Sequence, residues 1–230
     1  MNFLKLFFGI LTAPLRWLFF CFFKNKDKYI GESKYGLQHG HGIVNYSDGE
    51  KYIGEFREGL RHGRGSYLFS NGDNYIGDYK QGSRHGNGIY AAVHGAVYAG
   101  QFENGFPNGT GAETFSNGNK YMGEFKLGVP HGQGIQLWTD GATYHGEFRN
   151  GLANGHGTSI SRSGNSYVGD HKDGKKHGIG TFKWANGDTY SGEYRNDRRA
   201  GKGIEIYIEG DRYEGDWVDD NFEEIGRAHV

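Results

Sequence analysis

Histidine is the first residue type to consider for a metal site in this sequence, because imidazole nitrogens bind transition metals. The chain has 11 histidines, and five of them recur at the same place in a repeating pattern: His39, His62, His85, His131 and His177. If each repeat supplies two strands, equivalent atoms lie roughly 10 Å apart, from about 4.8 Å per strand. A tetrahedral zinc ion needs its nitrogen ligands about 2 Å away. The spacing therefore predicts no metal site and gives these histidines a structural role beside a turn.

Carboxylates form a second regular series, which raises the question of acid–base catalysis. The series is Glu32, Glu55, Asp78, Glu124, Glu147, Asp170, Glu193 and Asp216, with Gln101 at one position. Basic residues follow two positions later: Lys34, Arg57, Lys80, Lys126, Arg149, Lys172 and Arg195. A catalytic pair needs two carboxyls in unlike environments, whereas a repeating series gives each copy the same environment. We therefore expect cross-strand ion pairs, each contributing about 0.2–1 kcal/mol, and no active site.

Other sources of chemistry are scarce in the sequence. The single cysteine, Cys21, lies outside the repeats, and the Gly-x-Gly pairs lack the lysine and hydroxyl residue of a phosphate-binding loop. Lys and Arg number 26 against 27 acidic residues, and the two signs alternate, so no basic footprint for nucleic acid is present. The sequence thus predicts a chain without a catalytic site or cofactor and without a nucleic-acid partner.

The elements that position all these residues are set by a tyrosine that returns every 23 residues. The series is Tyr29, Tyr52, Tyr75, Tyr98, Tyr121, Tyr144, Tyr167, Tyr190 and Tyr213. A fixed period of this length indicates a repeat array, in which each unit buries its apolar face against its neighbours. Such arrays usually present binding surfaces.

Each repeat is predicted to be two short antiparallel strands. In the copy that begins at Tyr52, the residues Tyr52, Gly54 and Phe56 share one face of a strand. We expect a turn over residues 58–62, a second strand over 63–69, and a hairpin at Asn71-Gly72 where both residues tolerate positive φ. Recurrent aromatic residues two positions after a repeat glycine, and others near the end of the second strand, are expected to form one column over glycine backbone.

The pattern Tyr-x-Gly-Glu-Phe-x-x-Gly-x-x-His-Gly-x-Gly strongly resembles the MORN repeat. The resemblance covers residues 29 to about 223, in eight full copies and one partial copy. It implies an all-β, elongated antiparallel β-hairpin solenoid without catalytic activity of its own. It also implies membrane attachment, phosphoinositide binding, scaffolding or dimerisation as candidate roles. We expect about 17 strands and a length of roughly 80 Å. Departures from the motif, such as His171 and Asp197, are expected to be local weak points.

The first 23 residues are predicted to be an apolar, membrane-associating helix. Between Phe3 and Phe23 the only charges are Lys5 and Arg16, and a helix of this length spans about 31 Å, close to a bilayer core. The segment could lie in the interface or span the bilayer, and a helix that caps the end of the solenoid is the non-membrane alternative. The residues expected to contact lipid are Phe7, Phe8, Leu11, Trp17, Leu18, Phe19, Phe20, Phe22 and Phe23.

Residues 24–28 form a basic linker, in which Lys24, Lys26 and Lys28 are expected to favour anionic lipid and to place the array on the cytoplasmic side. Within the array, the candidates for anionic-lipid contact are Lys175, Lys176, Arg198 and Arg199.

Residues 224–230 leave the repeat register, and we interpret them as a sequencing read-through that is foreign to the array. The leading hypothesis for function is a non-enzymatic scaffold, tethered to a membrane by residues 1–23, that binds an unidentified protein partner and could form a homodimer. The alternatives are a phosphoinositide-binding module and the regulatory part of a longer enzyme.

Overall fold

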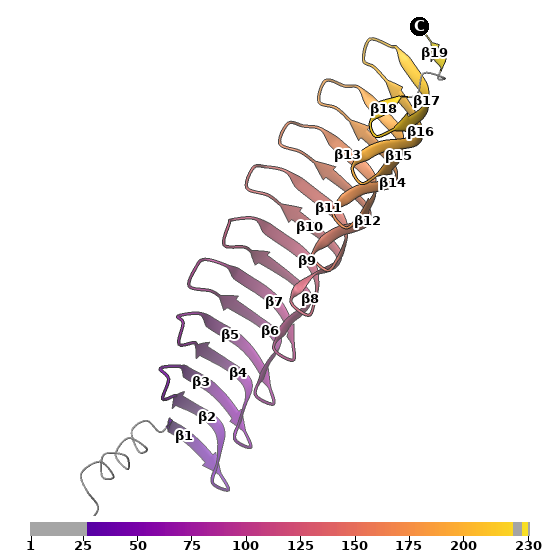
Figure 1. Ribbon diagram of the computed structural model, residues 1–230. Helices are drawn as coiled ribbons and strands as arrows, with labels where there is room; N and C mark the ends of the chain where they lie inside the picture. Colours follow the sequence, from indigo (N-terminus) through magenta and orange to yellow (C-terminus); the bar gives the residue numbers. More distant parts are fainter. Residues whose placement is uncertain (1–26, 223–226, 230) are drawn as a thin grey trace, which may run out of the picture.

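The computed structural model describes residues 27–222 and 227–229. The described residues form one antiparallel sheet of 19 strands, in which β1 to β17 each pair with their neighbours in sequence. Figure 1 shows a long, bent ladder of hairpins in a single layer. The strands are β1 (Lys28–Lys34), β2 (Leu37–Asn45), β3 (Lys51–Arg57), β4 (Leu60–Leu68), β5 (Asn74–Lys80), β6 (Ser83–Ala91), β7 (Val97–Glu103), β8 (Phe106–Thr114), β9 (Lys120–Lys126), β10 (Val129–Leu137), β11 (Thr143–Arg149), β12 (Leu152–Ile160), β13 (Ser166–Lys172), β14 (Lys175–Lys183), β15 (Thr189–Arg195), β16 (Arg198–Ile206), β17 (Arg212–Val218), β18 (Asn221–Phe222) and β19 (Arg227–His229).

The turns correct the predicted strand boundaries. The first turn of a repeat contains only two residues, such as Glu58 and Gly59, with φ of 52° and 81°. Because both are positive, this is the tight hairpin that matches the twist of the strands. The second strand consequently begins at Leu60 instead of residue 63. At the other end of the strand only Gly72 has positive φ, so the reason given for an Asn71-Gly72 hairpin was wrong.

One column of aromatic rings forms the core of this single-layer sheet. Neighbouring rings stand edge to face, with centroids 4.9–5.4 Å apart from Tyr29 to Tyr213. The repeat tyrosines from Tyr52 to Tyr190 are almost fully buried although the described residues form a single sheet without a second layer. The curvature of the strands therefore provides the enclosure, and the face that carries the column is the inner face of the molecule.

Glycine is required beneath the column, as expected. A Cβ added at Gly88 would overlap the ring of Tyr75, and one at Gly77 would overlap the backbone of Gly88. The Tyr75 hydroxyl donates to the carbonyl of Asp78 at 3.0 Å, and burial raises the pKa of Tyr75 to about 12. The predicted single column is wrong in one respect, because the aromatics near the ends of the second strands form a second, less buried row, of which Tyr46, Phe69, Phe115 and Trp184 pack against the buried residues of the core. That row is Tyr46, Phe69, Phe115, Trp138, Trp184 and Tyr207.

The acidic series does not pair with the basic series that follows it, so the expected ion-pair ladder is wrong in its partners. Two members of the acidic series form cross-strand ion pairs with other basic residues, Asp78 with Arg64 and Asp216 with Lys202, both at 3.6 Å. Glu55 accepts a hydrogen bond from the backbone amide of Arg64 at 2.9 Å, beside the bulge that precedes Gly65. The same bond joins Glu32 to His41, Asp78 to Asn87, Gln101 to Thr110, Glu124 to Gln133, Asp170 to Ile179 and Glu193 to Lys202. No member of the basic series forms an ion pair within residues 27–222. Because Gln101 performs the same role as glutamate, the role is acceptance of a hydrogen bond.

The ends of the chain complete the fold. Arg227–His229 of the tail form β19, which pairs with β17. The predicted N-terminal helix lies outside the described residues. Within the described part of the chain, no helix has the length and apolar character that crossing a bilayer requires.

Candidate binding groove

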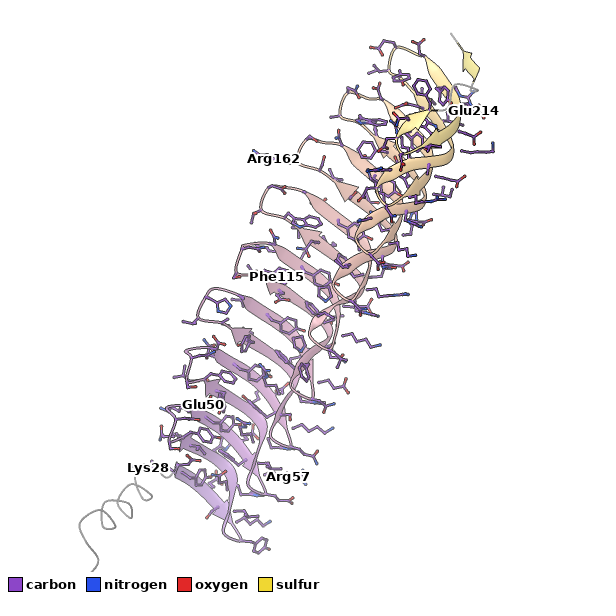
Figure 2. All side chains as sticks on the ribbon, viewed as in Figure 1. Lys28, Glu50, Arg57, Phe115, Arg162 and Glu214 are labelled. Atoms are coloured by element: carbon purple, nitrogen blue, oxygen red, sulfur yellow. The ribbon has the colours of Figure 1, made fainter. Side chains whose placement is uncertain are left out.

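The inner face carries a row of side chains that lies directly against the aromatic column. Equivalent positions on the even-numbered strands hold Gln38, Arg61, Arg84, Pro107, Pro130, Ala153, Lys176 and Arg199. Figure 2 shows Phe115 between the two edges of the sheet, whereas Arg57 and Arg162 lie at opposite edges. The row is therefore basic towards both ends of the array and uncharged in the middle.

The basic members of this row are engaged with aromatic rings. The guanidinium carbon of Arg61 lies 4.7 Å from the centroid of Tyr67 and 5.5 Å from that of Tyr79. The Arg199 guanidinium lies 4.0 Å from the centroid of Trp217 and pairs with Glu205 at 2.8 Å. Cations over aromatic faces are stabilised by the ring quadrupole. These side chains therefore cover the column and contribute to the stability of the array.

In the middle of the array small side chains leave a groove. The repeat that begins at Tyr144 has Ala153, Ser159 and Ser161 at three positions where nearly all other repeats have larger side chains. A cavity of about 730 Å³ lies there, between β8 and β14. The groove is defined by its lining: Phe115, Ser116, Asn117, Asn119, Gln136, Trp138, Tyr144, Phe148, Gly151, Leu152, Ala153, Ser159, His171, Gly174, Lys176, Phe182 and Asp197.

The walls of the groove are aromatic and partly exposed. Trp138 is 41 % exposed, and Phe115 and Phe182 are half-buried. Apolar walls with a few polar groups are typical of sites that bind a ligand or a partner side chain. Phe182 lies on β14, and Phe115 and Trp138 directly follow β8 and β10, so the paired strands hold the walls of the groove in place.

His171 is the polar group at the floor of the groove. It replaces the usual Phe or Tyr of the column and stands edge to face with Tyr144 and Tyr167, at 4.9 and 5.1 Å. Burial lowers the pKa of His171, so the ring is neutral near pH 7. Its Nδ1 lies 3.1 Å from the carbonyl of Gly169. Because a carbonyl only accepts, Nδ1 carries the proton and Nε2 is left as an acceptor.

His171 also divides the apolar core. One cluster of buried hydrophobic residues runs from Val44 to Phe148, and a second runs from Tyr167 to Trp217. The ring contacts continue through His171 to Tyr144 and Tyr167, and the local weakness expected at this position stays a prediction. Asp197, the other departure, keeps the positive φ of the glycine that it replaces, at 75°, and its carboxylate accepts a hydrogen bond from the Lys176 amide at 2.9 Å.

The residues predicted to contact anionic lipid lie in different settings. The Lys176 ammonium lies 4.6 Å from the centroid of Phe182, and burial lowers its pKa. Arg199 lies over the ring of Trp217 and pairs with Glu205, and Arg198 pairs with Asp219 at 3.2 Å. Lys175 is exposed and Lys28 begins β1. Lys24, Lys26 and the nine predicted lipid contacts between Phe7 and Phe23 lie outside the described residues.

The five regularly spaced histidines lie on five different strands, β2, β4, β6, β10 and β14, and do not converge. Within residues 27–222, no group of three or more His, Cys, Asp or Glu side chains could hold a metal ion. The groove was missed by sequence reasoning, although its signal was present: a comparison of the same position in every repeat finds Ala153, Ser159 and Ser161 as simultaneous small residues in one copy.

Comparison with known proteins identifies the repeats. No curated protein sequence matches the chain. Among solved structures, the TCP10 domain of CPAP from Danio rerio is 12 % identical, with a TM-score of 0.46, and the match covers 90 % of this chain and 93 % of that one. The TCP domain of SAS-4 from Drosophila melanogaster, solved with a proline-rich motif of Ana2, is 10 % identical, with a TM-score of 0.43 and coverage of 80 % and 94 %. Likenesses this weak carry no argument about function.

The MORN repeat family model matches the array from end to end. The matched segments are 29–51, 52–74, 75–92, 98–120, 121–143, 144–166, 167–189, 190–212 and 213–227. They reproduce the predicted eight full copies and one partial copy, and they cover most of the chain. The chain belongs to the MORN-repeat family.

Proposed function

We propose that this protein is a non-enzymatic scaffold whose inner groove binds a protein partner, and that residues 1–23 hold it at a membrane. The observation that carries the binding role is the groove between β8 and β14, because it offers Trp138, Phe115 and Phe182 on or directly beside paired strands. Exposed aromatic side chains are enriched at the centres of protein interfaces. Membership of the MORN-repeat family agrees with a binding role.

A site-specific photo-crosslinker tests the binding role. A benzophenone amino acid at Ser159 reports on the groove, and the same amino acid at Ile76, which is exposed on the outer face, is the matched control. We expect crosslinks to a distinct protein from Ser159 and none to that protein from Ile76. Equal crosslinking from both positions would show that the partner does not bind in the groove.

The membrane role rests on the composition of residues 1–23, which contain seven phenylalanines and two charged side chains. Deletion of these residues is expected to release the protein from pelleted membranes into the supernatant. Retention of the truncated protein on membranes would contradict the tether. The basic linker that follows favours a cytoplasmic position for the array.

Direct binding of anionic lipid by the array is the second candidate, and the side chains do not favour it. Lys176 and Arg199 are committed to aromatic rings, and Arg198 is paired with Asp219. Flotation of residues 29–223 with liposomes that contain phosphoinositide separates the two roles. We expect no flotation of the array alone.

A further inference from the structure

Three arginines of the array define a repeating site for a guanidinium group. Besides lying over aromatic rings, Arg61 donates Nη2 to the carbonyl of Gly82 at 3.0 Å and Arg84 donates to that of Gly105 at 2.7 Å. Arg199 donates to the Asp220 carbonyl at 2.8 Å. In each case the acceptor is the second turn residue of the next repeat. The site thus consists of a ring face on one side and one backbone carbonyl at the rim.

The backbone of this site is unchanged in repeats that lack the arginine. The amide of Gly82 donates to the carbonyl of Arg61 at 2.8 Å. In the same way, the amide of Gly151 donates to the carbonyl of Pro130, and the amide of Gly174 donates to the carbonyl of Ala153, both at 2.9 Å. The carbonyls of these two glycines are therefore held where a guanidinium would meet them. Both glycines line the groove, and no side chain among residues 27–222 donates to their carbonyls.

The ring face is also retained where the arginine is missing. Arg61 lies over Tyr52, Tyr67 and Tyr79. By the 23-residue period, the position of Ala153 faces Tyr144, Ser159 and His171. Tyr144 preserves an aromatic face. Ser159 opens the space, and His171 adds an acceptor at Nε2 that has no hydrogen-bond partner in the described part of the chain.

We infer that the groove receives an arginine side chain of the protein partner at the position left open by Ala153. This inference rests on the proposed binding function. The guanidinium lies against Tyr144 and donates to the carbonyl of Gly174 and to Nε2 of His171. It reproduces the contacts that Arg61 and Arg84 make within their own repeats. The two charged lining residues, Lys176 and Asp197, have opposite signs, so the groove does not carry a net charge that repels a cation.

Arginine fits this site better than the other side chains. A guanidinium is planar, stacks on rings and presents several donors in fixed directions, whereas an ammonium is compact and strongly hydrated. A purely apolar side chain would bury the Gly174 carbonyl and His171 Nε2 without partners, which is unfavourable. An acidic side chain would meet two acceptors and the negative face of an aromatic ring.

The direct test uses acetyl-Gly-Arg-Gly amide as the probe and the full chain in an uncharged detergent. Binding is followed by the indole N–H signal of Trp138 in NMR spectra, which the Trp138→Phe variant assigns. We expect saturable shifts with the arginine peptide. The citrulline peptide, which has the same shape but no charge, is expected to bind about tenfold more weakly because it loses the cation–ring attraction. Equal affinity for the two peptides would overturn the inference.

A pair of matched variants locates the site. Ala153→Arg supplies the array's own arginine at the open position and is expected to fold and to abolish the shifts. Ala99→Arg adds the same charge on the outer face, where Ala99 is exposed, and is expected to bind as the wild type does. Equal binding by the two variants would place the peptide elsewhere and refute the inference.

The same variants separate this inference from the proposed function. If Ser159 still crosslinks to its partner in the Ala153→Arg background, the partner occupies the groove without an arginine, and the inference is wrong while the binding role stands. If the arginine peptide binds but Ser159 crosslinks to no protein, the arginine site stands and the protein-binding role fails.

Discussion

Replacement of His171 by phenylalanine should remove an acid-sensitive element from the core of the array. The structure shows why: the imidazole is buried between Tyr144 and Tyr167, and burial lowers its pKa in the folded state. The hydrogen bond to the Gly169 backbone and the negative charge of Asp197 partly offset this effect. In the unfolded chain the pKa returns to about 6.5. Below that pH the unfolded chain binds a proton that the folded chain does not, so the free energy of unfolding falls as the pH decreases.

The size of the effect follows from linkage. A difference of one bound proton changes the free energy of unfolding by up to about 1.4 kcal/mol per pH unit between the folded and unfolded pKa values. At pH 7.5 the substitution gains about 0.5–1.5 kcal/mol from better ring contacts and loses about 1 kcal/mol with the hydrogen bond to Gly169. The two proteins should therefore have similar stability at pH 7.5 and diverge on acidification, with His171→Phe the more stable.

Urea unfolding at pH 7.5, 6.5 and 5.5, followed by circular dichroism, measures the divergence. His94→Gln is the control, because it removes an exposed histidine of the loop between β6 and β7 and is expected to keep the wild-type slope. The other histidines are common to all three proteins and cancel in the differences. Parallel stability curves for the wild type and His171→Phe would refute the claim that the imidazole is buried and neutral.

Three further substitutions test the inner face, each by urea unfolding. Gly88→Ala places a methyl group against the buried ring of Tyr75 and should destabilise the array by about 1–3 kcal/mol; an unchanged midpoint would contradict the close approach. Tyr75→Phe removes the hydroxyl that donates to the Asp78 carbonyl and should cost about 0.5–1.5 kcal/mol, and a gain in stability would count against that bond. Arg84→Ala removes the ring contacts and the hydrogen bond to Gly105 and should cost about 1–2 kcal/mol, with Arg84→Lys expected to recover part of the loss.

The sequence was sufficient to predict those features of the fold that close packing requires in every repeat. The need for Tyr75 to lie on Gly88 and Gly77 excludes all other residues at the glycine positions, so the requirement is visible as an unbroken period. The aromatic column was predictable for the same reason. The start of the second strand recurs at the same position of every repeat but was predicted three residues too late, because the first turn contains only two residues.

The bulge explains the main error. It lies between Gly54 and Glu55 in the pairing of β3 with β4, and it turns the Glu55 carboxylate towards the amide of Arg64. Strict alternation along a strand does not anticipate this change, so the carboxylates were expected to pair with basic side chains. The groove was missed for a different reason, because it arises from the absence of large side chains in one repeat. Ala153 and Ser159 become informative only when they are compared with Arg61 and Tyr67, which occupy the same positions in an earlier repeat.

The uniform strand spacing fixes the distance between the N-terminal end of the array and the groove. Each repeat adds two strands, or about 10 Å, from about 4.8 Å per strand. The groove between β8 and β14 therefore lies roughly 35–60 Å along the array from β1, where the chain enters from residues 1–26. Removal of one complete repeat, such as residues 52–74, would bring the groove about 10 Å nearer to that end while leaving its lining intact. The distance from β1 to the groove can thus change only in steps of one repeat, and such a change leaves the binding properties of the groove unaltered.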